Sequence, residues 1–124
     1  MIDVTRLKQS LRDAFRGFGR VFRQEQNFRV HLLVGIVIIV VAIVLPLSRM
    51  ERLFLVFLVT SIVVLELLNS ALELLVDILK PRLHEHVGQV KDILAAMVAA
   101  AAFGAAFIGG AIFLPYLLNL FSTW

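Results

Sequence analysis

Three long apolar runs dominate this chain of 124 residues, and they constrain its fold more than any other feature. They cover residues 30–47, 53–79 and 93–121, and the last contains no charged residue. A membrane-spanning helix needs about 20 mostly apolar residues, because each residue adds about 1.5 Å to a helix that must cross about 30 Å of hydrocarbon. The third run exceeds that length, the first is close to it, and the second reaches it if its polar residues are tolerated. The sequence therefore predicts three transmembrane helices over these ranges.

The composition excludes a conventional soluble enzyme. Residues of the set AVILMFWYC make up 60% of the chain and charged residues 17%, against about 45–50% and about 25% in soluble domains. A chain of this length could not hide so much apolar surface from water. None of the runs alternates with the period of two that a strand requires, and open sheet edges are not tolerated in lipid. We therefore expect one all-α membrane-embedded domain over residues 1–124.

Further classes are excluded by residues and motifs that the chain lacks. It has no cysteine, which rules out disulfides, thiolate metal sites and cysteine nucleophiles. Its net charge of +3 is too small to indicate a nucleic-acid partner without a basic patch interleaved with aromatic residues. Its glycines form neither a P-loop nor a dinucleotide-binding motif, and no Gly-x-Ser-x-Gly turn is present.

Residues 1–29 have the pattern of a helix that lies in the membrane interface. Apolar residues recur at spacings of three and four on one helical face, and arginines line another face. Such a helix buries its apolar side chains at the acyl boundary and turns its arginines toward anionic head groups. The apolar positions are Val4, Leu7, Leu11, Phe15, Phe18 and Phe22, and the basic ones are Arg12, Arg16, Arg20 and Arg23.

The distribution of Lys and Arg predicts the orientation in the membrane. Residues 1–29 hold seven of them and residues 80–92 hold three, whereas residues 48–52 hold two and the chain after residue 93 holds none. Basic residues accumulate on the cytoplasmic side of membrane proteins. We therefore expect a cytoplasmic N-terminus and an external C-terminus.

Small residues recur every fourth position in the third run and predict close helix packing. Without a hydrophobic force between helices in lipid, such rows allow two helices to approach each other closely. Three helices can hardly enclose a polar site alone, so we expect a homo-oligomer. The two rows are Ala96, Ala100 and Gly104, and Ala101, Ala105 and Gly109.

The second run carries a polar stripe with three acids that a purely structural segment has no reason to keep. Hydrogen bonding between helices would explain its Asn69 and Ser70 but accounts poorly for the acids. Its members lie at i, i+3, i+4, i+7 and i+11, so all project from one helical face. A carboxylate at the centre of a bilayer costs about 2.5–3.5 kcal/mol on insertion scales, which makes a functional role the expectation. Asp77, about 16 Å along the helix from Glu66, also fits a charge at a helix end. The stripe consists of Glu66, Asn69, Ser70, Glu73 and Asp77.

Other polar residues gather on the same predicted side of the membrane. They are Glu25 with Asn27, His84, and the pair Lys91–Asp92. Carboxylates with an amide oxygen and water suit a hard cation such as Mg²⁺. The His84-Glu85-His86 triplet is a weaker indication of zinc, because neighbouring residues in one short loop make a poor tetrahedral set.

Three functional classes fit these features to different degrees. Intramembrane carboxylates also mark proton or cation pathways, so a small oligomeric transport subunit is the alternative to an enzyme. Glu25 and Lys91–Asp92 favour the enzyme, because a transport path needs polar groups across the whole bilayer and the outward halves of all three runs are almost bare of them. A structural subunit explains the small-residue rows but leaves the acids unexplained.

Specific motifs add a resemblance to this picture. The segment Glu66-Leu-Leu-Asn-Ser-Ala-Leu-Glu73, followed by Asp77, resembles the signature of the small bacterial diacylglycerol kinase / undecaprenol kinase family. The stretch from Glu25 to Leu32, EQNFRVHL, is similar to the family's E-x-N-F-R-x-H-x stretch, and Lys91–Asp92 stands where the family has A-K-D. The resemblance covers nearly the whole chain. It implies a trimeric three-helix kinase of the cytoplasmic (inner) membrane of a bacterium, which transfers the γ-phosphoryl group of Mg-ATP to diacylglycerol or undecaprenol.

The resemblance also implies roles for individual residues. Glu66 corresponds to the catalytic base, and Glu25 and Glu73 correspond to ligands of the Mg²⁺ that accompanies ATP. The remaining matched positions imply contacts with substrate or nucleotide. These are Arg6, Asn69, Asp77, Arg82, His84, Lys91 and Asp92.

Overall fold

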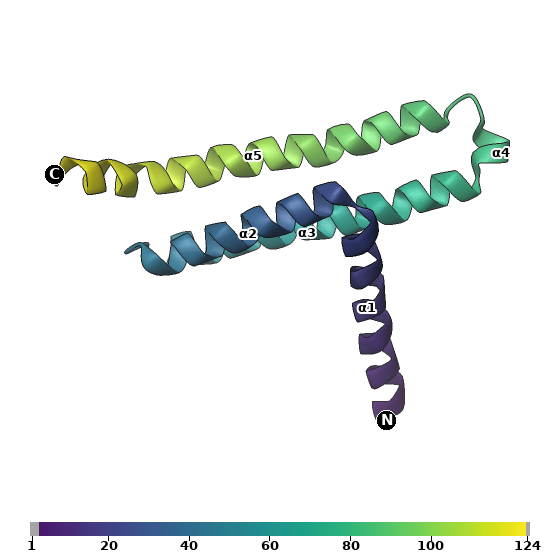
Figure 1. Cartoon of the computed structure of the whole chain (residues 1–124), viewed down its shortest axis with the longest axis horizontal. Helices are drawn as coiled ribbons and strands as arrows, with labels where there is room; N and C mark the ends of the chain where they lie inside the picture. Colours follow the sequence, from purple (N-terminus) through teal and green to yellow (C-terminus); the bar gives the residue numbers. More distant parts are fainter. Residues whose placement is uncertain (1–2, 124) are drawn as a thin grey trace.

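A computed structural model describes residues 3–123, and within that range the chain is helical with no strand (Figure 1). Three of its helices are long and apolar enough to cross a membrane, which confirms the predicted all-α architecture with three transmembrane helices. Residues 1–2 of the predicted interfacial segment lie outside the described range. The helices are α1 (Val4–Gln24), α2 (Gln26–Val44), α3 (Arg49–Ile78), α4 (Lys80–Leu83) and α5 (Val87–Ser122).

Helix α1 leaves the bundle crosswise, as an interfacial helix would (Figure 1). Asp3 caps it by accepting hydrogen bonds from the backbone N–H groups of Thr5 and Arg6 at 3.0 and 3.2 Å. It ends at Gln24, whereas the sequence predicted one segment through residue 29. Glu25 adopts an extended backbone that stops one helix and starts the next.

Two side chains of α2 fix the junction between α1 and α2. Arg29 donates from Nη1 to the carbonyl oxygens of Phe22 and Arg23, both at 3.0 Å, which satisfies acceptors that the end of α1 would otherwise leave unpaired. Phe28 is fully buried and meets the ring of Phe18 edge-on, with 5.1 Å between the ring centres. These contacts set the direction in which α1 departs.

The ends of the spanning helices differ from the predicted ranges for local reasons. Helix α2 ends at Val44 rather than at residue 47, because Leu45 precedes Pro46 and takes the extended conformation that this position favours. Helix α3 begins at Arg49 rather than at residue 53, because Ser48 and Glu51 form a reciprocal capping box. Helix α5 begins at Val87, since backbone hydrogen bonding continues through polar residues that hydropathy assigns to a loop.

Helix α3 is the central element and packs against both α2 and α5. One end of the bundle is held by a small core of Ala42, Leu47 and Leu55 and by a hydrogen bond of 2.7 Å from the Tyr116 hydroxyl to Glu51 Oε2. Gly109 is buried in the bundle, and Ala101 and Ala105 are half-buried in the same row. The other small-residue row, Ala96, Ala100 and Gly104, is exposed.

Candidate functional site

The polar stripe occupies the second half of α3, and its members become more exposed toward the α4 end. Glu66 is buried, with 3% of its surface exposed. Asn69, Ser70 and Glu73 are half-buried, and Asp77 is exposed. The stripe therefore leads from the interior of the bundle to its surface.

Glu66 meets a histidine from the neighbouring helix. His31 Nδ1 on α2 forms a hydrogen bond with Glu66 Oε1. The side chains of His31 and Glu66 are 28% and 4% exposed, respectively. The deepest carboxylate of the stripe is thus held by a group that can donate or accept a proton.

Asn69 and Glu73 lie one turn apart on α3 and contact each other. Asn69 Nδ2 donates to Glu73 Oε1 at 3.1 Å. Asn69 Oδ1 and the Ser70 hydroxyl are buried and have no hydrogen-bond partner within the described part of the chain. Because an unsatisfied buried polar atom is costly, these two oxygens are available to hydrogen-bond a group from outside the described chain.

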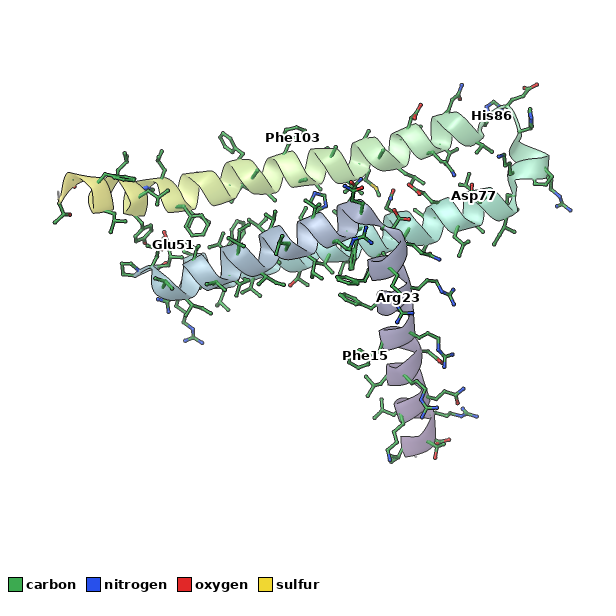
Figure 2. The ribbon with its side chains drawn as sticks, in the orientation of Figure 1. Phe15, Arg23, Glu51, Asp77, His86 and Phe103 are labelled. Atoms are coloured by element: carbon green, nitrogen blue, oxygen red, sulfur yellow. The ribbon has the colours of Figure 1, made fainter. Side chains whose placement is uncertain are left out.

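Asp77 and Lys91 link α3 to α5 near the α4 end. Lys91 Nζ lies 2.7 Å from Asp77 Oδ1, and the two side chains are 37% and 52% exposed. Asp77 projects from α3 toward the first turns of α5 (Figure 2). This pair places a cation and a carboxylate at the mouth of the stripe.

Glu25 makes no side-chain capping hydrogen bond at the α1–α2 junction, but the packing register gives its level along the bundle. The His31–Glu66 contact sets the register of α2 against the antiparallel α3. Six residues before His31 lies Glu25, which directly precedes α2, and six residues after Glu66, α3 reaches Leu72. Each of these steps covers about 9 Å toward the α4 end of the bundle. Glu25 therefore lies at the axial level of Leu72 and Glu73.

The donor set at this level fits Mg²⁺ accompanied by phosphates. Glu25 and Glu73 offer carboxylate oxygens, and Asn69 offers an amide oxygen without a partner. Residues 3–123 contain no group of three His, Cys, Asp or Glu side chains arranged to hold a metal by themselves. Mg²⁺ is commonly bound through one or two carboxylates, waters and substrate phosphates rather than by a complete protein cage.

Four sequence-predicted site residues are not brought to the stripe. Arg6 pairs with Asp3 at 3.4 Å and lies about 28 Å along α1 from Glu25. Arg82 and His84, on and just after α4, and Asp92, on α5, are exposed. Within the described chain, no hydrogen bond or ion pair joins any of the four side chains to the residues of the stripe.

An apolar cleft of about 210 Å³ runs between α2, α3 and α5. His31 and Ala102 lie at the end nearest the stripe, and Phe113 lies at the other end. Its wall on α5 is made largely of alanine and glycine, which leave room for an apolar guest. A lipid chain is the kind of molecule that such a cleft accommodates.

His31 is the site residue that sequence reasoning missed. It lies at the start of the first apolar run, and its contact with Glu66 depends on tertiary packing. A signal existed, because a histidine at the start of an apolar run is a polar residue at the edge of a membrane-spanning segment. The Tyr116–Glu51 contact was also missed, because it joins residues far apart in the sequence.

Comparison with known proteins identifies similar chains. Residues 12–113 match the family model described as "Prokaryotic diacylglycerol kinase". A Synechocystis protein named "Diacylglycerol kinase" is 35% identical over 112 residues, which cover 90% of this chain and 64% of that protein. A Bacillus subtilis protein named "Undecaprenol kinase" is 31% identical over 115 residues, or 93% of this chain and 94% of that protein. This chain thus spans somewhat less than two thirds of the first relative and nearly all of the second.

Proposed function

The chain belongs to the prokaryotic diacylglycerol kinase family, a family of lipid kinases, and on that premise we propose that it transfers the γ-phosphoryl group of ATP to the primary hydroxyl of a lipid alcohol. Diacylglycerol and undecaprenol are the two candidate acceptors. The observation that carries the proposal is the stripe on α3, which joins a buried carboxylate inside the bundle to a charged pair at its surface.

In this proposal Glu66 is the general base. It accepts the proton of the lipid hydroxyl while the hydroxyl oxygen forms a bond to the γ-phosphorus, and the bond from that phosphorus to the bridging oxygen of ADP breaks. Phosphoryl transfer depends on positioning and charge neutralisation more than on covalent help from the protein. The apolar cleft, which ends at His31, would hold the lipid chain so that its hydroxyl lies near Glu66.

Glu25 and Glu73 are the proposed ligands of Mg²⁺, which supplies charge neutralisation at the phosphates when it is bound. Their shared level along the bundle and the unpaired Asn69 oxygen support this assignment. Asp77 and Lys91 stand at the mouth of the stripe, where a nucleotide would enter. The remaining nucleotide contacts in the proposal are Asp92, Arg82, His84 and Arg6.

We also propose that the active enzyme is a homotrimer in the cytoplasmic membrane, with its N-terminus inside and its C-terminus outside. Arg6 lies too far along α1 to reach the stripe of its own chain, so in this proposal it contacts the nucleotide bound to another copy. The exposed row of Ala96, Ala100 and Gly104 offers a surface on which helices can approach closely. The transport alternative is disfavoured because the cleft is lined almost entirely by apolar side chains from His31 to Phe113.

The test is ATP-dependent phosphorylation of diacylglycerol and of undecaprenol by the purified protein in detergent micelles with Mg²⁺. We expect Glu66→Gln to lower kcat by at least about 100-fold, the lower range for loss of a general base. Asp13→Asn is the matched control, because Asp13 is exposed on α1 and should leave kcat unchanged. Near-normal turnover of Glu66→Gln would overturn the assigned base. A wild-type protein that phosphorylates neither alcohol would overturn the function.

A further inference from the structure

We propose that His31 is a positioning residue for Glu66. In this arrangement its Nδ1–H holds Oε1 of the carboxylate, so that Oε2 stays free to accept the proton of the acceptor hydroxyl. The inference rests on the proposed function, in which Glu66 is the base. It adds a residue from a different helix whose role is to fix the orientation of that base.

The burial of Glu66 makes the contact important. Its side chain is 4% exposed, so water cannot stabilise its charge. Among residues 3–123, His31 is the one side chain that forms a hydrogen bond with it, since the Asn69 amide donates to Glu73 instead. Without His31 the carboxylate would keep its burial and lose the contact that fixes its rotation.

The chemistry of the pair determines which nitrogen carries the proton. An ionised carboxylate can only accept hydrogen bonds, so Nδ1 of His31 must donate. In a neutral imidazole the other nitrogen, Nε2, is then an acceptor. The contact therefore specifies one tautomer of His31 as well as one orientation of Glu66.

Gly35 allows α2 to come close enough for this contact. It lies one turn beyond His31, and a Cβ atom at Gly35 would stand 2.7 Å from Cγ1 of Val59 on α3. A larger residue at this position would therefore require the Val59 side chain or the helices to shift. The hydrogen bond between His31 and Glu66 thus lies one turn from a point of close helix packing.

The pair lies where the apolar cleft meets the stripe. His31 lines the end of the cleft, and Glu66 begins the series of polar groups that leads to Asp77. A lipid alcohol whose chain fills the cleft would present its hydroxyl at this junction. Fixing the carboxylate there aligns the proton acceptor with the reacting oxygen, an alignment in which an error of about 1 Å can cost about 100-fold in rate.

Kinetics of a set of His31 variants test the proposal. His31→Ala should lower kcat by about 100-fold and leave the KM for Mg-ATP unchanged, because the nucleotide contacts lie elsewhere. His31→Asn should restore most of the rate, since its amide nitrogen occupies the place of Nδ1, whereas His31→Gln should remain low. His86→Asn, at an exposed histidine, is the control. Equal losses in the Asn and Ala variants, or a normal kcat in His31→Ala, would contradict the role.

Nitrogen NMR of ¹⁵N-histidine-labelled protein gives a readout that does not require activity. The chain has three histidines, and the His31 signals are those that disappear in His31→Asn. We expect His31 as the Nδ1–H tautomer in the wild type, and a mixture of tautomers in Glu66→Ala. His31 signals that are unchanged in Glu66→Ala would contradict the pairing of His31 with Glu66. Lipid phosphorylation by the wild-type protein would still support the proposed function in that case. If circular dichroism shows that a His31 variant does not fold, the comparison of the His31 signals in wild type and Glu66→Ala still tests the proposed pair.

Discussion

At the scale of single residues, the acids of α3 differ in environment although they share one face. Glu66 is buried against His31, Glu73 accepts from Asn69, and Asp77 is exposed and paired with Lys91. Burial suits a group that exchanges a proton with a lipid hydroxyl, and exposure suits a group that meets a nucleotide from water. The position along the stripe therefore separates the proposed roles.

Lys91 should matter more for nucleotide binding than for stability. Exposed ion pairs contribute little to folding, because water and salt screen them. We expect Lys91→Met to raise the KM for Mg-ATP about tenfold, as for loss of one charged hydrogen bond, with little change in the thermal midpoint. Steady-state kinetics and circular dichroism in micelles measure both quantities.

Lys91→Arg is the matched control for this prediction, because it retains the positive charge and should keep most of the affinity. A Lys91→Met protein with a normal KM and a lowered thermal midpoint would assign the pair a purely structural role.

At the scale of elements, α3 holds its two neighbours by different means. Against α2 it packs closely, with Gly35 facing Val59 and His31 facing Glu66. Against α5 it is joined near both ends, by Glu51 with Tyr116 and by Asp77 with Lys91. The register of α3 therefore places the polar groups of all three helices at common levels.

Gly35→Ala should destabilise the bundle, because the added methyl group meets Val59 at 2.7 Å. Overpacking of this kind costs about 1–3 kcal/mol. We expect Val59→Ala to rescue it, so that the free energy of unfolding of the double variant exceeds that of Gly35→Ala. Denaturation in mixed micelles, followed by circular dichroism, measures each variant.

Gly17→Ala is the control, because nothing lies within 4 Å of a Cβ atom at that glycine of α1. It should be neutral or slightly stabilising. If the Gly35→Ala and Val59→Ala substitutions change the free energy of unfolding in a strictly additive way, the close approach of Gly35 to Val59 does not limit the packing of α2 against α3.

At the scale of the whole molecule, the helices are longer than a bilayer requires. The 30 residues of α3 and 36 residues of α5 extend about 45 and 54 Å, against about 30 Å of hydrocarbon. Both project together beyond the point where α1 turns away, toward α4 (Figure 1). The mouth of the stripe is thereby carried toward the aqueous phase.

The proposed orientation can be tested by labelling, since the chain contains no cysteine. In intact spheroplasts a membrane-impermeant maleimide should label Ser122→Cys and not Lys8→Cys. Breaking the membrane should expose Lys8→Cys, with cysteine-free wild type as the blank. Labelling of Lys8→Cys alone would invert the orientation, and equal labelling of both would contradict an odd number of membrane crossings.

The sequence determined the helical class, the three spans and the face that carries the acids, because these follow from hydropathy and from the 3.6-residue period. It did not determine the helix ends, which depend on Pro46, on the capping box of Ser48 and Glu51, and on the break at Glu25. Such ends are set by local hydrogen bonds rather than by apolar length.

Only the tertiary structure decided which polar groups meet. The pairing of His31 with Glu66, of Lys91 with Asp77, and of Tyr116 with Glu51 joins different helices. The period of one helix specifies a face but not the rotation and register of its neighbour, which depend on close packing such as that at Gly35. The sequence therefore identified the acids of the candidate site, and the packing of α2 and α5 against α3 supplied their partners.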